Sequence, residues 1–502
     1  MGNIDLLFQG FQNVVSFDHL IIMASGVMLG LLVGVLPGLG AANGVTLLIP
    51  LTLSMDPLSA IILLTSIYWG ALFGGSTTSI LFNIPGEPSS VATTFDGHPM
   101  AKAGAATEAL SFAFLSAGLG ALAGVVLITL LSGYVADFAM QFSPPEFFGV
   151  FLLAFASFVG LGSSSPFKTI AMIALGLGLG QIGTDTVSGT IRLTHGFDEL
   201  MRGVSFLVAV IGLFGIGELL ITVEEGLKFS GISARIRPAV VFETLLKMPR
   251  YWVTLVRSIA VGCWMGVTPG GPTAASFMSY GLAKRFSRTP ERFGKGAPEG
   301  VVAPEAADHA AGSCAMLPTL ALGIPGSATA AVMLGGLMIW GLTPGPMLFV
   351  TQQDFVWGLI ASMYLGNVVA VILVLATVPL FTLILRVPFF IIAPLILVIC
   401  VVGAYTVAGA RFDLVLLLLF GVLGYLAKKL DYPLAPLILA MVIGDKAEDA
   451  FRQSLVMSQG AFSIFWSSWI GIVVLTLAAL LVVSPLFGRL LRAGRPAPAA
   501  GE

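Results

Sequence analysis

Residues 20–55 form a stretch that is too long and too apolar to fold as one ordinary helix. They include no Lys, Arg, Asp or Glu. As a single α-helix this stretch would be about 54 Å long, whereas the hydrocarbon core of a bilayer is about 30 Å thick. Pro37 and Gly38 lie near its middle, and both residue types interrupt helices. The sequence therefore predicts a membrane segment that is broken or folded back at this point.

Other parts of the chain also favour a membrane protein. Of the 502 residues, 57% are hydrophobic and only 10% are charged, whereas a soluble domain is about 25% charged. Further uncharged runs cover residues 109–136, 355–385 and 461–487, and each is longer than the roughly 20 residues that a spanning helix needs. We expect an all-α polytopic membrane protein of about 10–12 transmembrane helices. We expect neither a removable signal peptide nor a separate soluble domain.

The break at residues 34–40 (Gly-Val-Leu-Pro-Gly-Leu-Gly) has a counterpart in the second half, Gly-Val-Thr-Pro-Gly-Gly at 266–271. A second pair follows, Asn-Ile-Pro-Gly-Glu at 83–87 and Gly-Ile-Pro-Gly-Ser at 323–327. Broken membrane helices are tolerated only where protein or a water-filled cavity satisfies the freed backbone groups. Matching breaks in two halves are therefore the best sequence indication of a transporter's substrate site.

The distribution of basic residues predicts the topology. Residues 1–101 contain no Lys or Arg, whereas residues 224–257 and 284–295 are rich in both. Basic loops favour the cytoplasm, so the uncharged residues 258–283 between them would form a re-entrant hairpin. The opposite charge bias around the first-half motif predicts two inverted repeats, with the N-terminus outside and the C-terminus inside. We divide the chain into a first membrane repeat (1–222), a basic cytoplasmic connector (223–257), a second membrane repeat (258–487) and a cytoplasmic tail (488–502).

The breaks supply the candidate substrate-binding residues. Backbone N–H groups at the start of a half-helix favour carboxylates, and neighbouring hydroxyls can assist. The candidates are Pro37, Gly38, Gly40, Ser76, Thr77, Thr78, Pro85, Gly86, Pro269, Gly270, Gly271, Pro325, Gly326, Ser327 and Thr329. The alternative is that these small residues only pack membrane helices together.

Cation coupling is the predicted role of Asn83, Asp308 and His309. Asn83 and unwound carbonyls could coordinate Na⁺, and an Asp–His pair near a broken helix is expensive to keep in lipid without a function. The alternative places Asp308 and His309 in a wet loop that caps the following helix.

Several polar residues elsewhere favour structural roles. The sequence predicts a solvated loop for Glu87, Asp96, His98 and Lys102. It predicts a structural pair for Glu448 and Arg452, which are four residues apart.

We expect no enzyme activity and no cofactor. Residues 178–183 fit G-x-G-x-x-G, but they lie in a predicted membrane helix, and we interpret them as helix packing. P-loop, H-E-x-x-H and G-x-S-x-G motifs are absent from the sequence. The three cysteines have no metal-ligand spacing. An intramembrane enzyme is a remote alternative, and it would have to use Asp308 and His309 near Ser313 and Cys314.

The motifs resemble the large membrane subunit of the tripartite tricarboxylate transporters, the TctA family. The matching segments are residues 34–40, 74–86, 96–102, 293–301, 303–305, 323–327, 341–346, 358–367 and 420–425. The resemblance implies a secondary importer of di- or tricarboxylates, coupled to Na⁺ or H⁺, in the inner membrane of a bacterial cell. It implies two partners, a small membrane subunit and a periplasmic solute-binding protein. A stand-alone carboxylate carrier or exchanger is the alternative.

The chain departs from the family pattern at one candidate coupling site. Where the family tends to have Glu-Ala-Ala-Asn-Asn-Ala, residues 305–310 read Glu-Ala-Ala-Asp-His-Ala. Because Asp and His can titrate and Asn cannot, proton coupling, alone or together with Na⁺, becomes a hypothesis.

Overall fold

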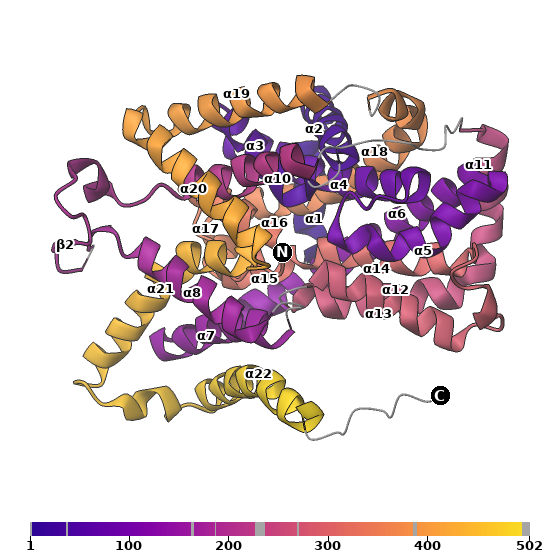
Figure 1. The fold of residues 1–502 in the computed structure, drawn as a ribbon. Coiled ribbons are helices and arrows are strands. Elements are labelled where there is room, and N and C mark those ends of the chain that lie inside the picture. The colour runs from indigo at the N-terminus through magenta and orange to yellow at the C-terminus, as the bar shows by residue number, and fades with distance from the viewer. Residues whose placement is uncertain are drawn as a thin grey trace. The chain divides into compact units, whose positions relative to one another are not determined.

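The computed structural model describes residues 3–36, 39–161, 165–185, 187–225, 236–268, 271–384 and 389–493 (Figure 1). These residues are almost entirely helical. Within them, the strands are β1 (Gly183–Thr184) and β2 (Ile191–Arg192), which pair antiparallel with Gly183 opposite Arg192. The predicted all-α fold class is confirmed.

The chain divides into two compact units. Unit 1 comprises Met1–Met140 and Ser205–Lys429, and unit 2 comprises Gln141–Val204 and Leu430–Glu502. Each unit is therefore built from two separate parts of the sequence. The predicted repeats, 1–222 and 258–487, were defined by sequence similarity between the two halves of the chain, whereas the two units are defined by compactness. The division into repeats therefore stays a prediction.

Unit 1 contains most of the helices. In chain order they are α1 (Asn3–Val14), α2 (Phe17–Val35), α3 (Gly40–Thr52), α4 (Pro57–Phe82), α5 (Val91–Met100), α6 (Ala106–Ala139), α9 (Phe206–Val210), α10 (Gly217–Glu225), α11 (Pro238–Lys247), α12 (Trp252–Val267), α13 (Gly271–Phe286), α14 (Glu299–Cys314), α15 (Met316–Leu322), α16 (Ala328–Ile339), α17 (Leu348–Thr351), α18 (Gln353–Ile384), α19 (Phe389–Ala408) and α20 (Arg411–Lys429). Short helical turns are η1 (Pro88–Ser90), η2 (Ala101–Ala105), η4 (Ile211–Ile216), η5 (Met248–Tyr251) and η6 (Pro290–Arg292).

Unit 2 is smaller. It contains α7 (Pro144–Leu161), α8 (Pro166–Gly180), the two strands, η3 (Asp198–Arg202), α21 (Leu434–Met457), η7 (Phe462–Trp466) and α22 (Trp469–Ala493). Helix α8 ends inside the G-x-G-x-x-G motif, so only its first three residues are helical, and Gly180 among them faces Met441 of α21. Gly178 has no atom within 4 Å of the place where a Cβ would be, and Gly183 lies in β1.

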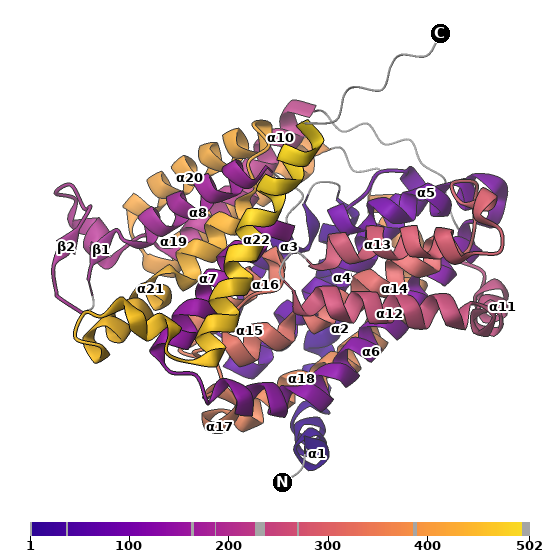
Figure 2. The same ribbon diagram turned by 90° about the horizontal axis from the view of Figure 1, so that it is seen from below.

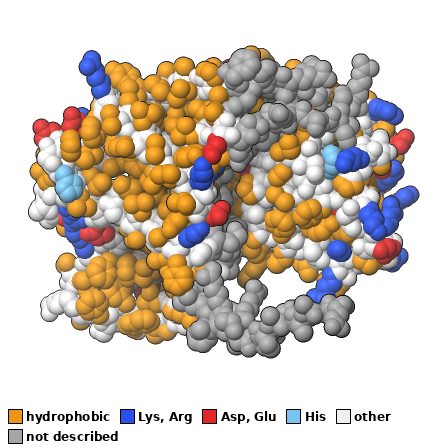
Figure 3. Space-filling view, viewed as in Figure 1, with side chains coloured by type: hydrophobic (Ala, Val, Ile, Leu, Met, Phe, Trp, Pro, Cys, Tyr) orange, Lys and Arg blue, Asp and Glu red, His pale blue; other side chains and the backbone are white. Residues whose placement is uncertain are grey.

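Five described helical segments are long and apolar enough to cross a membrane. They are Phe17–Val35, Pro57–Phe82, Pro88–Ala139, Phe206–Glu224 and Gln353–Leu380. Hydrophobic side chains cover broad areas of the face in Figure 3. On α19 and α20, Leu395, Leu418 and Leu419 are each more than half exposed. Surface of this kind is suited to lipid contact.

The long uncharged run near the start is divided, as the sequence predicts. Helix α2 ends at Val35 and α3 begins at Gly40. The predicted break itself, Pro37 and Gly38, lies outside the described residues. In the second half α12 ends at Val267 and α13 begins at Gly271, and Pro269 and Gly270 also lie outside the described residues.

Helices α12 and α13 form a helical hairpin and lie beside α14 (Figure 2), and its re-entrant path in a membrane stays a prediction. The hydroxyl of Ser279 on α13 donates to the hydroxyl of Ser258 on α12 across 2.6 Å. Because Ser258 is near the start of α12 and Ser279 near the end of α13, the two helices run antiparallel.

Close helix packing occurs at matching places in the two halves. A Cβ on Gly30 of α2 would lie 2.1 Å from the carbonyl oxygen of Ile67 on α4. A Cβ on Gly262 of α12 would lie 2.4 Å from the carbonyl oxygen of Ala307 on α14. These distances are below van der Waals contact, so each helix pair requires glycine where the backbones meet.

Candidate functional site

The second pair of sequence breaks has the same backbone geometry in both halves. Helix α4 is followed by the capping residue Asn83 with φ 59° and ψ 27°, and α15 by Gly323 with φ 69° and ψ 25°. In each case the N–H of this residue donates to a carbonyl of the preceding turn, that of Thr78 or Pro318. The left-handed residue reverses the chain and leads it into the Ile-Pro-Gly sequence.

The glycine that follows each reversal fits against the end of a broken helix. A Cβ on Gly86 would lie 2.3 Å from the carbonyl oxygen of Gly34 and 2.6 Å from Cα of Gly75. A Cβ on Gly326 would lie 2.7 Å from the carbonyl oxygen of Gly266. Each Ile-Pro-Gly turn therefore lies directly against the residues that precede a Pro-Gly break. The structure brings the predicted segments together in two pairs.

The start of α3 holds a carboxylate from the chain itself. The side chain of Glu87 accepts a hydrogen bond from the N–H of Ala41, and a Cβ on Gly40 would lie 3.5 Å from the same carboxylate oxygen. The predicted solvated loop is wrong for this half-buried residue. The N–H groups near Gly40 were predicted to bind an anion, and here one of them, that of Ala41, binds the carboxylate of Glu87.

The predicted hydroxyl residues of the first half belong to a continuous helix. Ser76, Thr77 and Thr78 are buried within α4. The hydroxyls of Thr77 and Thr78 donate to the carbonyl oxygens of Phe73 (2.9 Å) and Gly75 (3.0 Å). The backbone unwinds only after Phe82, at Asn83, which is exposed. The role of these residues in substrate binding stays a prediction.

The predicted residues of the second half line the other turn. Ser327 caps α16, because its hydroxyl accepts from the N–H of Ala330 across 3.1 Å. Pro325, Gly326 and Thr329 are buried beside it. Their substrate-binding role is likewise untested.

Ser76 meets an acidic residue that the sequence prediction did not include. Its hydroxyl donates to one carboxylate oxygen of Glu305 across 2.8 Å, and the hydroxyl of Thr93 on α5 donates to the other across 2.6 Å. Glu305 lies on α14 and is 1% exposed. The contacts join α4, α5 and α14.

Asp308 and His309 lie inside α14, so their placement in a wet loop is wrong. Their side chains are 2% and 0% exposed. Nδ1 of His309 lies 3.2 Å from the carbonyl oxygen of Glu305, and the ring packs on Phe73 with 4.5 Å between ring centroids. Oδ1 of Asp308 and Nε2 of His309 have no hydrogen-bond partner among the described residues.

Three acidic residues belong to this region. Glu87 packs against Gly75, next to the Ser76 that binds Glu305, and Asp308 follows Glu305 by three residues on the same helix, so these two are neighbours on its surface. Among the ion pairs of the described residues, none joins any of these three carboxyl groups to Lys or Arg. The described residues also contain no group of three or more His, Cys, Asp or Glu side chains placed to hold a metal ion.

Asp96 connects two of the segments that resemble the family, residues 96–102 and 293–301. The predicted solvated loop is wrong for this residue as well. It is fully buried rather than solvated. One carboxylate oxygen accepts from the N–H groups of Gly294 (2.9 Å), Gly296 (2.8 Å) and Ala297 (2.7 Å). The other accepts from the Tyr280 hydroxyl at 2.9 Å. The segment at 96–102 is therefore fastened to the segment at 293–301.

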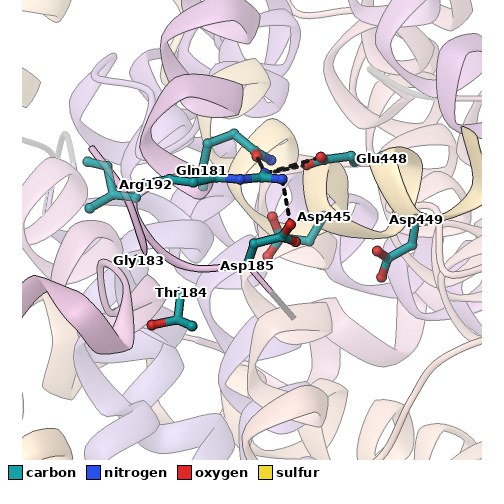
Figure 4. Close-up of a pocket in the computed structure, with 10 residues that line it drawn as sticks. Gln181, Gly183, Thr184, Asp185, Arg192, Asp445, Glu448 and Asp449 are labelled. Carbon is teal, nitrogen blue, oxygen red and sulfur yellow. Dashed lines mark hydrogen bonds and ion pairs between the residues drawn. The ribbon is translucent and has the colours of Figure 1, made fainter. Parts of the chain in front are cut away.

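A second polar cluster lies in unit 2, around a small cavity of about 50 Å³ (Figure 4). Arg192 pairs with Asp185 at 2.8 Å and with Glu448 at 3.1 Å, and it donates to Gln181. Arg452 pairs with Glu448 as predicted, and also with Asp185 at 3.0 Å. Hydrogen bonds from Ser188 and Arg452 hold the pKa of Asp185 well below its usual range. The cluster fastens the β1–β2 hairpin to α21.

Comparison with known proteins places the chain in a family. A family model described as "Tripartite tricarboxylate transporter TctA family" matches residues 20–439. A protein of Agrobacterium vitis, described as "Uncharacterized 52.8 kDa protein in TAR-I ttuC' 3'region", is 35% identical over 467 residues, which cover 93% of this chain and 92% of that protein.

Another Agrobacterium vitis protein, "Uncharacterized protein in TAR-II ttuC' 3'region", is 36% identical over 226 residues, covering 45% of this chain and 93% of that protein. No solved structure matches. The extent of the family match agrees with the motif resemblance along nearly the whole sequence. The chain belongs to the tripartite tricarboxylate transporter TctA family.

Proposed function

We propose that the chain is the membrane-embedded permease subunit of a cation-coupled secondary importer of di- or tricarboxylates. The family implies a tricarboxylate transporter subunit, and the proposal adds import, coupling and the location of the site. We infer that it works in the inner membrane of a bacterial cell, with a small membrane subunit and a periplasmic solute-binding protein as partners.

One observation carries the proposal, the pairing of each Ile-Pro-Gly turn with a Pro-Gly break. Gly86 lies against Gly34, and Gly326 lies against Gly266. Equivalent broken segments that meet in two halves of a chain are typical of carriers built from inverted repeats, with substrate bound between the half-helices. We therefore infer two inverted repeats and a substrate site beside the two turns.

The chemistry of the site supports carboxylates as substrates. The first turn of α3 binds the carboxylate of Glu87, so its N–H groups are suited to groups of this kind. We infer that the backbone around Pro37–Gly40 and Pro269–Gly271 contacts the substrate. The hydroxyls of Ser327 and Thr329 would assist.

Coupling to Na⁺ or H⁺ completes the proposal. Asp308 and His309 are buried without a Lys or Arg partner among the described residues, and intramembrane groups of this kind usually serve ion pathways. Asn83 is exposed at the first turn, and it would contribute an amide oxygen if the ion is Na⁺.

An intramembrane enzyme receives no support from these contacts. In the described part of the chain, no hydrogen bond joins His309 to Ser313 or Cys314. A nucleophile and its base would need such a contact or a close approach to one.

Transport by reconstituted protein tests the function. The chain and its small subunit would be placed in proteoliposomes, and uptake of labelled di- and tricarboxylates would be measured under Na⁺ or proton gradients, with and without the binding protein. We expect accumulation that requires both the binding protein and a cation gradient. Accumulation without the binding protein would instead identify a stand-alone carrier, and absence of uptake under every gradient would contradict the proposal.

A further inference from the structure

We propose that Glu305 is the proton-binding residue of the transport cycle, with Asp308 as the second member of a proton-sharing pair. This inference rests on the proposed transport function and names its coupling ion. It differs from the sequence-based hypothesis, which assigned coupling to Asp308 and His309 and did not include Glu305.

The surroundings of Glu305 are suited to both protonation states. Its two carboxylate oxygens accept hydrogen bonds from the hydroxyls of Ser76 and Thr93, and its side chain is 1% exposed. Ser76 Oγ also lies 3.2 Å from the carbonyl oxygen of Leu72. When Glu305 takes up a proton, the Ser76 hydroxyl can turn to Leu72 and accept from the carboxyl group, so the hydrogen bonding is reversed without a large movement.

The charge balance favours reversible protonation at this position. A buried carboxylate without a cationic partner costs several kcal/mol, and it can avoid this cost by binding a proton. Glu305 has no Lys or Arg partner among the ion pairs of the described residues. Its own hydrogen bonds reduce the cost of the ionised form, so neither form is excluded.

Asp308 provides the second, independent observation. It lies within the same helix, it is 2% exposed, and its Oδ1 has no hydrogen-bond partner among the described residues. Residues three apart on a helix are neighbours, and two neighbouring like charges disfavour simultaneous ionisation, so Glu305 and Asp308 are suited to sharing one proton. A proton on the unpartnered Oδ1 of Asp308 would remove the negative charge from a buried group that has no hydrogen-bond donor at that oxygen within the described ranges.

The remaining titratable groups fit this assignment. Tyr68 on α4 and Glu87 before η1 interact electrostatically with Asp308, and neither supplies a positive charge. Nδ1 of His309 lies 3.9 Å from the Glu305 carboxylate, but its closer partner is the Glu305 carbonyl oxygen at 3.2 Å. A carbonyl oxygen only accepts, so Nδ1 carries the hydrogen of this contact, and Nε2 is buried without a partner in the described part of the chain.

Several ionisable groups on α14 and on the helices packed against it make contacts away from Glu305. On α5, Asp96 binds Tyr280 of α13, and His98 contacts the carbonyl of Ile80. Glu108 of α6 pairs with Lys247, and Arg257 of α12 stacks on Phe286. Cys314 of α14 contacts the carbonyl of Gly124. None of these contacts reaches Glu305.

The proton step would connect ion movement with the substrate. The Glu305 carboxylate binds a proton from the outside solution and becomes a neutral carboxylic acid, and it returns to the carboxylate when the proton leaves to the cytoplasm. Neutralisation lowers the repulsion that a substrate carboxylate meets near Asp308 and Glu87. It also weakens the hydroxyl contacts by which α14 is joined to α4 and α5.

The test compares Glu305→Gln with the wild type and with Glu291→Gln, a control in the helical turn η6, where Glu291 is exposed. Gln keeps the shape of the side chain and remains neutral. A gradient of one pH unit supports about tenfold accumulation per coupled proton at zero membrane potential. We expect Glu305→Gln to lose about this tenfold factor while it still exchanges internal for external substrate.

Two transport results would overturn the inference. One is accumulation by Glu305→Gln that responds to the pH gradient as the wild type does. The other is wild-type uptake that follows only a Na⁺ gradient and moves no protons, which would leave the proposed import function intact.

A measurement without transport keeps the inference testable if no substrate is found. Infrared difference spectra of the purified protein across a pH titration report protonated carboxyl groups. We expect a titrating carboxyl band in the wild type and in Glu291→Gln. This band should be absent from Glu305→Gln. In Ser76→Ala it should remain but titrate at a different pH. If Glu305→Gln removes no titrating band, Glu305 is not the proton site.

Discussion

The contacts of Asp96 lead to a quantitative prediction about stability. Its carboxylate accepts three backbone N–H groups from the loop before α14 and the hydroxyl of Tyr280 on α13. The side chain is fully buried. Replacement of Asp96 by Ala would leave these donors without their acceptor.

The expected loss follows from the number and burial of the donors. A hydrogen bond to a charged group contributes about 1.5–3 kcal/mol, and a buried donor left unpaired costs about 1–3 kcal/mol. The Ala297 bond is buried, whereas the Gly294 and Gly296 bonds are part-buried and water can replace them in part. We therefore expect Asp96→Ala to lower the free energy of unfolding by about 3–5 kcal/mol. Asp96→Asn keeps an oxygen acceptor for the three N–H groups, and we expect it to lose about half as much.

Denaturant titration in detergent micelles, followed by far-ultraviolet circular dichroism, would measure these differences. Asp354→Ala is the matched control, because Asp354 is exposed at the start of α18. The reasoning is refuted if Asp96→Ala costs no more than Asp354→Ala, or if Asp96→Asn is as damaging as Asp96→Ala.

Two further predictions concern the turn after α4 and the cluster in unit 2. Gly86→Ala places a Cβ 2.3 Å from the Gly34 carbonyl oxygen, and we expect a loss of about 1–3 kcal/mol in unfolding free energy by the same titration. Gly281→Ala, which has open space on α13, should be neutral or slightly stabilising, and equal effects of the two would contradict the packing argument. For Asp185, a folded-state pKa below the ordinary value of 3.8 means stabilisation above that pH and its loss as the pH falls. Asp185→Asn should therefore be less stable than the wild type at neutral pH, with a difference that shrinks in acid, and a constant difference would show that its charge is not responsible.

The sequence predicted the fold class and the broken helices because both depend on local patterns. An uncharged run that exceeds the bilayer thickness must be interrupted, and Pro and Gly show where. The ends of α2 at Val35 and of α12 at Val267 agree with those positions. The hairpin of α12 and α13 followed from basic residues on both sides of an uncharged stretch.

Burial of individual polar residues could not be predicted in the same way. Asp96 and Glu87 follow a predicted break, where solvated loops are common. Their actual surroundings come from residues far away in the sequence, Gly294 to Ala297 for Asp96 and Ala41 for Glu87. Asp308 and His309 were placed, as one alternative, in a wet loop that caps the following helix. Small alanines nevertheless allow close packing on all sides of α14.

Glu305 illustrates the limit most clearly, because its partner Ser76 is 229 positions away. A local pattern records only that an acid occurs in an apolar run, and that observation fits an ion pathway, a helix cap or an ion pair equally well. The distinction depends on which residues of α4 and α5 face α14. Hydroxyls alone satisfy a carboxyl group in either protonation state, whereas a Lys or Arg at the same place would have fixed it as an ion pair. The matching backbone of the two turns could be inferred from sequence because it depends on Pro and Gly, but the chemistry between them depends on this one long-range contact.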